Sequence, residues 1–565
     1  MTGIATQPSS LEIAQAAELQ PITDIADRLG LLPDEVEPYG RYKAKIGLGA
    51  LDRLRSAPTG KIVCVAGVTP TRAGEGKTTT AVSLTQGLGA IGRRPVLCLR
   101  EPSLGPGFGI KGGAAGGGYT QVVPMEDLNL HFTGDIHAIG AANNLLAAML
   151  DASILHANPH KIDALRVTWR RVVDINDRAL RDIAIGLGGR ANGYPRETGF
   201  DITAASEVMA ITAVASSLED LRSRLGAITV AHTYEDGSPV TAEDLEAAGA
   251  MAVLLRDAIK PNLIQTLEGQ PCLMHCGPFA NIAHGNSSLI ADLLGLRLGE
   301  YVVTESGFGS DMGMEKFFDI VCRVGGIRPS AVVLVATARA LKHHGGLDDL
   351  EGVSPVRSLA GMVEGSANLA RHLEIVRGFG LPCVVAVNRR PEDTDDEIEL
   401  LCSLAKEHGA FAAEVNDGFV RGGAGAAALA EAVVEACEQP TDFRFSYADE
   451  DSIEAKIEAV ATRVYGARDV FLYPEASKKI AQFTKDGLAK LPICMAKTHL
   501  SLSADPALLN APTGFTLPVR DIRAYTGAGW LVPLCGDITQ MPGLGKESAA
   551  RNVDLGPDGR IVGLF

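Results

Sequence analysis

The segment that decides the fold reads KIVCVAGVTPTRAGEGKTTT and spans residues 61–80. Its first part, Lys61–Val68, is short, apolar and rich in β-branched residues, which predicts a buried strand closed by a Gly/Pro loop. Thr78–Ile91 has helical spacing and ends at Gly92. Pro95–Arg100 predicts a second strand. A strand, a helix and a strand within about forty residues form a βαβ unit, which implies a parallel sheet.

The loop between the first strand and the helix has the composition of a phosphate-binding loop. Gly74 and Gly76 let backbone N–H groups approach phosphate oxygens, and Lys77 carries a positive charge to the β- and γ-phosphates. Thr78 supplies a hydroxyl for Mg²⁺, and the helix N-terminus adds partial positive charge. The expected ATP-binding residues are Thr71, Arg72, Ala73, Gly74, Glu75, Gly76, Lys77 and Thr78.

This loop departs from the usual pattern G-x-x-x-x-G-K-[ST], because Thr71 stands where the first Gly would be. The plain alternative is a Gly-containing turn with a solvated Lys77. The strand before the loop and the helix after it favour the phosphate site. Arg72 either adds a second cation near the phosphates or points to solvent, and solvation is the default for an arginine in such a loop.

Arg100 and Glu101 follow the second strand at its carboxyl end, where ligands bind in open α/β sheets. A guanidinium at Arg100 suits a carboxylate or acyl phosphate, and Glu101 can hold a cation. The alternative is a simple ion pair at the end of the strand. Residues 102–135 are too Gly-rich for a regular element and too long for a turn, so we expect an ordered active-site loop.

Further buried strands are predicted at Ala331–Ala338 and Pro382–Asn388. A helical stretch over 424–438 precedes Pro440, which we interpret as a domain boundary. The expected fold is a three-domain α/β subunit in which a P-loop-type parallel-sheet nucleotide domain is joined by two further α/β domains. Their expected ranges are 1–285, 286–440 and 441–565.

Composition narrows the class of protein. The chain has 565 residues and a net charge of −16, so it repels nucleic acid and anionic lipid overall. Its 10 cysteines lie mostly in apolar runs, which is typical of reduced core thiols. There is no signal-peptide pattern at the start and no apolar run of about 20 residues, the length of a membrane span. We therefore expect a cytoplasmic protein with no nucleic-acid or membrane partner.

Several longer blocks carry a resemblance that reaches over essentially the whole chain. Together with residues 69–135, they are similar to signatures of the formate–tetrahydrofolate ligase (10-formyltetrahydrofolate synthetase) family. The blocks are GFDITAASEVMAI (199–211), GPFANIAHGNSS (277–288), TESGFGSDMGMEKFFDI (304–320), LPICMAKTHLSLS (491–503) and MPGL (541–544).

The resemblance implies a homotetramer that converts ATP, formate and tetrahydrofolate into ADP, phosphate and 10-formyltetrahydrofolate by way of formyl phosphate. It implies that 1–285 activates formate and that 286–440 contributes to the folate site. Lys77 and Arg100 would be catalytic, with Arg100 holding formyl phosphate. Glu101 and Asp135 would bind an activating monovalent cation, K⁺ or NH₄⁺.

The family holds the folate ring between aromatic side chains, and this chain differs there. Arg390 in NRRPEDT replaces one ring, and Phe419 in DGFVRGG takes the place of the other. Phe308 in GFGSD is a third expected folate contact. A guanidinium plane can stack on a pterin, so folate binding by Arg390 is compatible with this change. Without the resemblance, Phe308 and Phe419 would be interpreted as core or capping residues.

A possible metal-binding pattern has weaker support than the ligase signatures. Cys272, His275 and Cys276 lack the second ligand pair of a zinc site. Two other classes of function remain open at this stage. One is an ATPase that uses nucleotide as a conformational signal. The other is a folate-binding protein that has lost catalysis through Arg72 and Arg390.

Overall fold

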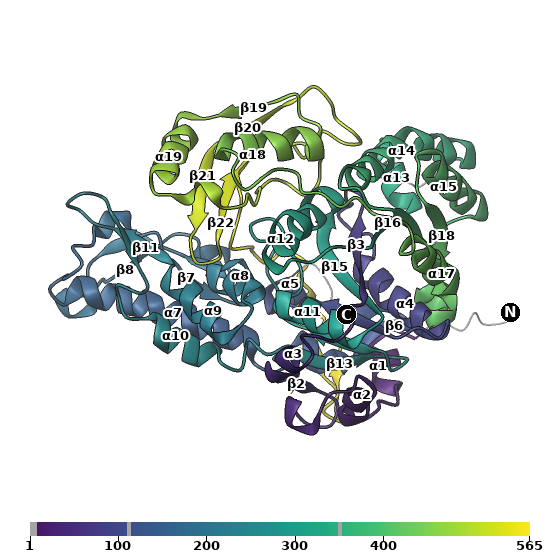
Figure 1. The fold of residues 1–565 in the computed structure, drawn as a ribbon, viewed down its shortest axis with the longest axis horizontal. Coiled ribbons are helices and arrows are strands. Elements are labelled where there is room, and N and C mark those ends of the chain that lie inside the picture. The colour runs from purple at the N-terminus through teal and green to yellow at the C-terminus, as the bar shows by residue number, and fades with distance from the viewer. Residues whose placement is uncertain (1–7, 110–114, 348–352, 565) are drawn as a thin grey trace.

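A computed structural model describes residues 8–109, 115–347 and 353–564. Its centre is a mixed, mostly parallel sheet (Figure 1). The parallel strands are, in spatial order, β14 (Pro271–Met274), β4 (Pro95–Leu99), β15 (Tyr301–Gly309), β3 (Lys61–Gly67), β16 (Ala331–Ala336), β17 (Cys383–Asn388) and β18 (Ala412–Asn416). One edge continues antiparallel through β13 (Asn262–Thr266), β2 (Ala44–Ile46) and β1 (Val36–Pro38).

The parallel strands are largely apolar and buried because helices cover both faces of the sheet. Every residue of β4, β16 and β17 is buried. The strands expected from sequence are therefore confirmed, with shifts of one or two residues at their ends. β16 stops at Ala336 because Thr337 caps the next helix, α13 (Ala338–His344), through a 3.0 Å hydrogen bond from the Ala340 N–H.

At strand β3 the chain reverses the direction in which it adds strands to the sheet. It pairs with β15 on one side and with β16 on the other. From β3 the chain passes through α4 (Lys77–Ala90) to β4, beyond β15, whereas β16, β17 and β18 extend the opposite side. In open α/β sheets, ligands bind outside the carboxyl ends of the strands at such a reversal. The loop after β3 lies there.

Helix α4 is buried along most of its length. Residues Thr80–Leu88 are all buried between the sheet and α17 (Ala427–Ala436). A Cβ on Gly87 would stand only 2.7 Å from the Ala426 carbonyl oxygen, so this close approach requires glycine. The structure begins the helix expected over 424–438 later than predicted, because residues 422–426 form a 3₁₀ turn first.

The segment 102–135 was expected to lack regular elements, and that expectation is wrong. It contains α5 (Leu104–Phe108), β5 (Gly116–Gly117), β6 (Thr120–Val123) and α6 (Met125–Asn129). β6 joins the central sheet by pairing with β13. The glycines that argued against structure let β5 turn back tightly on β6, since a Cβ on Gly116 would meet the Thr120 carbonyl oxygen at 2.2 Å. Residues 110–114 lie outside the described part.

Helices α7 (Asp135–Leu155), α8 (Glu207–Val214), α9 (Leu218–Gly226) and α10 (Ala248–Leu255) gather on the left of Figure 1. Within the described ranges, α7 alone is long and apolar enough to cross a membrane. It nevertheless carries buried Asp135 and Asn143 and packs against α8, α10 and β7 (Arg171–Val173). We therefore interpret α7 as a packing helix of the folded protein.

The C-terminal part lies outside the central sheet, at the top of Figure 1. It contains α18 (Ile453–Ala459), α19 (Pro474–Lys485) and two strand pairs, β19 (Asp469–Leu472) with β20 (Thr516–Val519) and β21 (Asp521–Tyr525) with β22 (Trp530–Leu534). Glu207 of α8 joins it to the rest of the chain. Its Oε1 accepts hydrogen bonds from the N–H groups of Gly527 and Ala528 in the β21–β22 turn, at 2.8 and 3.2 Å.

This buried carboxyl makes stability depend on pH. Burial raises the pKa of Glu207 from 4.5 to about 7. The hydrogen bonds from the two backbone N–H groups lower this pKa, but by less than burial raises it. Between these values the folded state binds more protons than the unfolded state, so stability falls as pH rises. Glu207→Gln keeps the acceptor oxygen and cannot ionise. We expect the stability of the variant relative to the parent to increase from pH 5 to pH 8, by up to about 3 kcal/mol.

The measurement is denaturant unfolding of both proteins at the two pH values. A stability difference that is the same at pH 5 and pH 8 would contradict a raised pKa for Glu207.

Candidate functional site

The loop after β3 is shaped by two glycines and one buried carboxylate. Gly74 and Gly76 have φ of 75° and 77°, the left-handed region that favours glycine. Glu75, which is 1% exposed, folds back between them. Its Oε1 accepts the Thr71 N–H at 2.7 Å, and its Oε2 accepts the Thr337 hydroxyl. Burial would raise the pKa of Glu75, but these hydrogen bonds bring it below its usual value.

Lys77 begins α4 and lies over the end of β3. Its Cδ stands 3.2 Å from the position that a Cβ on Gly67 would occupy, so the lack of a side chain there leaves room for the lysine stem. Arg72 is exposed, as is Ala73. The loop thus presents backbone N–H groups, one lysine and the N-terminus of a long helix, which together suit a triphosphate.

Thr78 contacts a carboxylate on the neighbouring strand. Its hydroxyl donates to Glu305 Oε2 at 2.9 Å, and Glu305 is only 6% exposed. In the described ranges Glu305 forms no ion pair with a lysine, arginine or histidine. A threonine hydroxyl from the start of the helix and a carboxylate from a neighbouring strand are the protein ligands that Mg²⁺ takes beside phosphate in P-loop enzymes.

Arg100 lies on the other side of β15 from the loop. Its Nη1 donates to the Pro278 carbonyl oxygen at 3.3 Å and lies equally close to the position of a Cβ on Gly307. The next residue, Phe308, has its carbonyl oxygen 3.7 Å from the Cβ position of Gly67, over which Lys77 lies. Arg100 and Lys77 are therefore brought to two sides of one short segment, Gly307–Phe308.

Two buried donors at this place have no hydrogen-bond partner among the described residues. They are Nε of Arg100 itself and Nε2 of His284. The other ring nitrogen of His284 accepts the Asn286 N–H at 3.2 Å, so the neutral ring carries its proton on Nε2. Burial, together with the charges of Arg100 and Lys316, lowers the pKa of His284 to about 3. Unpartnered donors in a cationic surrounding are what a small anion needs.

Comparison with known proteins agrees with this geometry. A family model described as formate–tetrahydrofolate ligase matches residues 8–565. The chain belongs to the formate–tetrahydrofolate ligase family. It is 57% identical over 564 residues to the formate–tetrahydrofolate ligase of Desulforamulus reducens, with 99% of each chain covered. Proteins of the same name from Roseiflexus castenholzii and Methylorubrum populi are 55% and 54% identical, covering 98% and 99% of this chain and 100% of theirs.

The two carboxylates expected to hold a monovalent cation in this ligase family member differ in their surroundings. Asp135 already has a cation, because Lys45 Nζ lies 2.8 Å from Oδ1 and 2.9 Å from Oδ2, and Asn262 donates to Oδ2 at 2.8 Å. Glu101 is 4% exposed, and in the described part of the chain its Oε2 has no hydrogen-bond partner. Burial, then the charge of Asp135, raises the pKa of Glu101 well above its usual value. Lys45 was not singled out from sequence.

The three expected folate contacts come from β15 and from the segments that follow β17 and β18. Phe308 has φ of 61° and stacks on His499, with ring centroids 4.2 Å apart. Phe419 follows β18, and a Cβ on Gly117 would stand 2.9 Å from its Cε2. Arg390 follows β17, next to β18, and its guanidinium reaches the carbonyl oxygen of Gly74.

The strand end before the loop is held by a buried network. Thr69 N–H donates to His372 Nε2 at 2.8 Å, and its carbonyl oxygen accepts from His344 Nε2 at 3.0 Å. Asn510, from the C-terminal part, donates its N–H to His344 Nδ1 at 3.1 Å. Burial lowers the pKa of both histidines to about 4, so both rings are neutral. His344 is thus part of the support of the loop.

The cysteine–histidine pattern is not a metal site in the described ranges. Both ring nitrogens of His275 are engaged at 2.7 Å, with Ser288 Oγ and the Ala258 carbonyl oxygen. Burial raises the pKa of the Cys272 thiol and also that of Cys276. These residues belong to the core.

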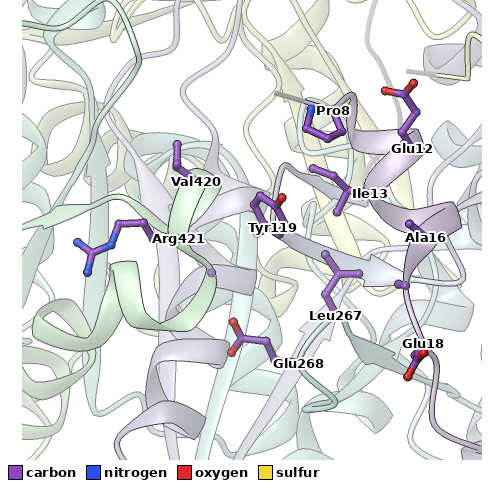
Figure 2. Close-up of a pocket in the computed structure, with 12 residues that line it drawn as sticks. Pro8, Glu12, Ile13, Ala16, Glu18, Tyr119, Leu267, Glu268, Val420 and Arg421 are labelled. Atoms are coloured by element: carbon purple, nitrogen blue, oxygen red, sulfur yellow. The ribbon is translucent and has the colours of Figure 1, made fainter. Parts of the chain in front are cut away.

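A separate groove of about 870 Å³ lies on the surface beside α1 (Ser10–Ala16). Figure 2 shows Tyr119, Ile13 and Leu267 close together in it, with the Arg421 guanidinium pointing away from them. Its other charged groups are carboxylates, among them Glu268. As far as the described residues go, no member of the phosphate loop lines this groove, and its negative charge disfavours ATP or folate.

The two glycines of the loop offer a matched pair of substitutions. Gly74→Ala and Gly76→Ala both force a left-handed alanine, which costs about 1–2 kcal/mol. At Gly74 a Cβ meets nothing within 4 Å, but at Gly76 it stands 2.4 Å from Asn388 Nδ2. We expect Gly76→Ala to weaken ATP binding at least about tenfold more than Gly74→Ala, because Asn388 must also move. Calorimetric titration with ATP measures this, and equal losses would contradict it.

Proposed function

We propose that the chain ligates formate to tetrahydrofolate with ATP, through formyl phosphate, giving 10-formyltetrahydrofolate, ADP and phosphate. The observation that carries this proposal is the position of Arg100 and Lys77 on two sides of Gly307–Phe308. A triphosphate at Lys77 and a one-carbon carboxylate at Arg100 then lie within reach of each other. Proximity of this kind can supply much of the barrier reduction for phosphoryl transfer.

In the first step an oxygen of formate attacks the γ-phosphorus, and the bond from that phosphorus to the β,γ-bridging oxygen breaks, so ADP leaves. Lys77 and the loop N–H groups balance the charge on the transferred group. Arg100 and His284 offer their unpartnered donors to the formyl phosphate. In the second step N10 of the folate attacks the formyl carbon, phosphate leaves and the amine loses its proton.

The residues present fit a magnesium ion at the phosphate loop. Thr78 and Glu305 would hold it, since Glu305 is buried and contacts Thr78 through a hydrogen bond rather than an ion pair. When bound, the ion would neutralise part of the phosphate charge. Glu305 keeps the Thr78 hydroxyl turned toward this position.

A monovalent cation, K⁺ or NH₄⁺, is proposed at Glu101. The unpartnered Oε2 of Glu101 fits a ligand, whereas both oxygens of Asp135 are occupied by Lys45 and Asn262. Asp135 would then act on the cation through its charge and through Lys45. Folate contacts are proposed at Phe308 and Phe419. At the third expected position, Arg390, the guanidinium reaches the carbonyl oxygen of Gly74 instead.

We also propose the division into domains 1–285, 286–440 and 441–565, a cytoplasmic location and a homotetramer. An apolar surface on α10 and α7 supports self-association. On α10, Val253 is 74% exposed and Leu254 41%, and on α7 Ala148 and Ala152 face solvent. Analytical ultracentrifugation tests this, and a monomer's mass at micromolar concentration would contradict it.

Omission of each substrate in turn tests the reaction. We expect ADP release that requires both formate and tetrahydrofolate, and a loss of at least about 10²-fold in Lys77→Ala, which removes charge from the transferred group. ADP release indifferent to both substrates would indicate a nucleotide switch instead. Folate binding without any formylated product would indicate a protein that has lost catalysis.

The metal site has its own test. Glu305→Gln removes the negative charge but keeps a hydrogen-bond acceptor for Thr78. We expect about tenfold weaker Mn²⁺ binding in the presence of ADP, because one ionic ligand is lost. Electron paramagnetic resonance of Mn²⁺ measures this without turnover.

Glu300→Gln is the control, since Glu300 lies at the opposite end of β15 and pairs with Arg93. Equal Mn²⁺ affinity in the Glu305 and Glu300 variants would exclude Glu305 as a metal ligand.

A further inference from the structure

The carbonyl oxygen of Gly74 accepts hydrogen bonds from two arginines. Arg390 Nη2 donates to it at 2.8 Å, and Arg339 Nη2 donates at 2.5 Å. Arg339 lies in α13, which follows β16, and Arg390 follows β17. Two neighbouring strand ends thus each send one guanidinium to the tip of the phosphate loop.

A third contact ties the same strand end to the loop. Asn388, the last residue of β17, donates from Nδ2 to the carbonyl oxygen of Glu75 at 2.9 Å. The segment after Asn388 is also held, because the Arg390 N–H donates to Asp393 Oδ2 at 2.8 Å. Arg390 therefore reaches Gly74 from a fixed backbone and not from a freely moving loop.

The two guanidiniums stand close enough for their charges to act on each other. Burial lowers the pKa of Arg339, and the charge of Arg390 lowers it further, whereas the carboxylates Glu75, Glu392 and Asp393 act in the opposite direction. Of these, Glu75 already accepts hydrogen bonds from Thr71 and Thr337. Among the described residues, neither Nε of Arg339 nor Nε of Arg390 has a hydrogen-bond partner. Like charges held together at a loop that binds phosphate gain stability when a polyanion arrives.

We propose that Arg390 is a positioning residue for the nucleotide, which with Arg339 clamps Gly74 and adds positive charge behind the loop. This inference rests on the proposed function, and it changes the role of the segment 388–394 in this chain. Arg390, which stands in the place of a folate-stacking ring, contacts the phosphate loop instead. Nucleotide affinity, more than folate affinity, depends on it.

The test compares Arg390→Ala with Arg389→Ala by calorimetric titration with ATP and, separately, with tetrahydrofolate. Arg389 is the matched control, because it is adjacent, equally charged and paired with Asp395. We expect Arg390→Ala to weaken ATP about tenfold and tetrahydrofolate less than twofold, with Arg389→Ala changing neither by more than twofold. Arg390→Lys should recover part of the ATP affinity, since it restores the charge but not the planar donor pair.

Kinetics and a double-mutant cycle separate positioning from general structural damage. We expect the KM for ATP to rise in Arg390→Ala while the KM for tetrahydrofolate stays constant. Arg339→Met and Arg390→Met should be non-additive in ATP affinity, because they share one acceptor. Normal ATP affinity with weakened tetrahydrofolate binding in Arg390→Ala would overturn the proposal, as would equal losses in the Arg389 control.

These readings are independent of product formation. If no variant and no parent protein made 10-formyltetrahydrofolate, the proposed function would fail while the ATP titrations still decided the role of Arg390.

Discussion

The parallel pairing of β3 with both β15 and β16 is the constraint on which the site depends. Because β3 lies between these strands, its final loop opens where the sheet reverses direction. β15 brings Glu305 to one side of the loop, and β16 and β17 bring Arg339 and Asn388 to the other. The contacts to the loop come from three neighbouring strands and the segments that follow them, so the register of the sheet fixes the geometry of the phosphate site.

Local patterns allowed much of this to be predicted. β3, α4, β4 and the phosphate loop are contiguous, and their apolar runs and glycines carry the information within one βαβ unit. Arg100 was selected by its place at a strand end. The same rule applied to β17 would have selected Asn388, whereas Glu305 lies in the middle of β15.

What sequence could not supply is which strand ends meet. Glu305, Asn388 and Arg339 lie far from the loop along the chain, and their proximity follows only from the strand order. Lys45 was hidden for another reason: a lone lysine in a polar stretch is usually solvated, and here it is 1% exposed beside Asp135.

The pairing of Cys64 with Ser306, 242 positions apart, bears on how the chain is made. While the ribosome is still synthesising the first half, both edges of β3 are bare, and apolar strands in that condition invite wrong partners. Contacts of such long range also close slowly. Newborn chains of this enzyme therefore pass through a vulnerable interval that ends only when β15 and β16 have emerged, and a holding chaperone is of most use during that interval.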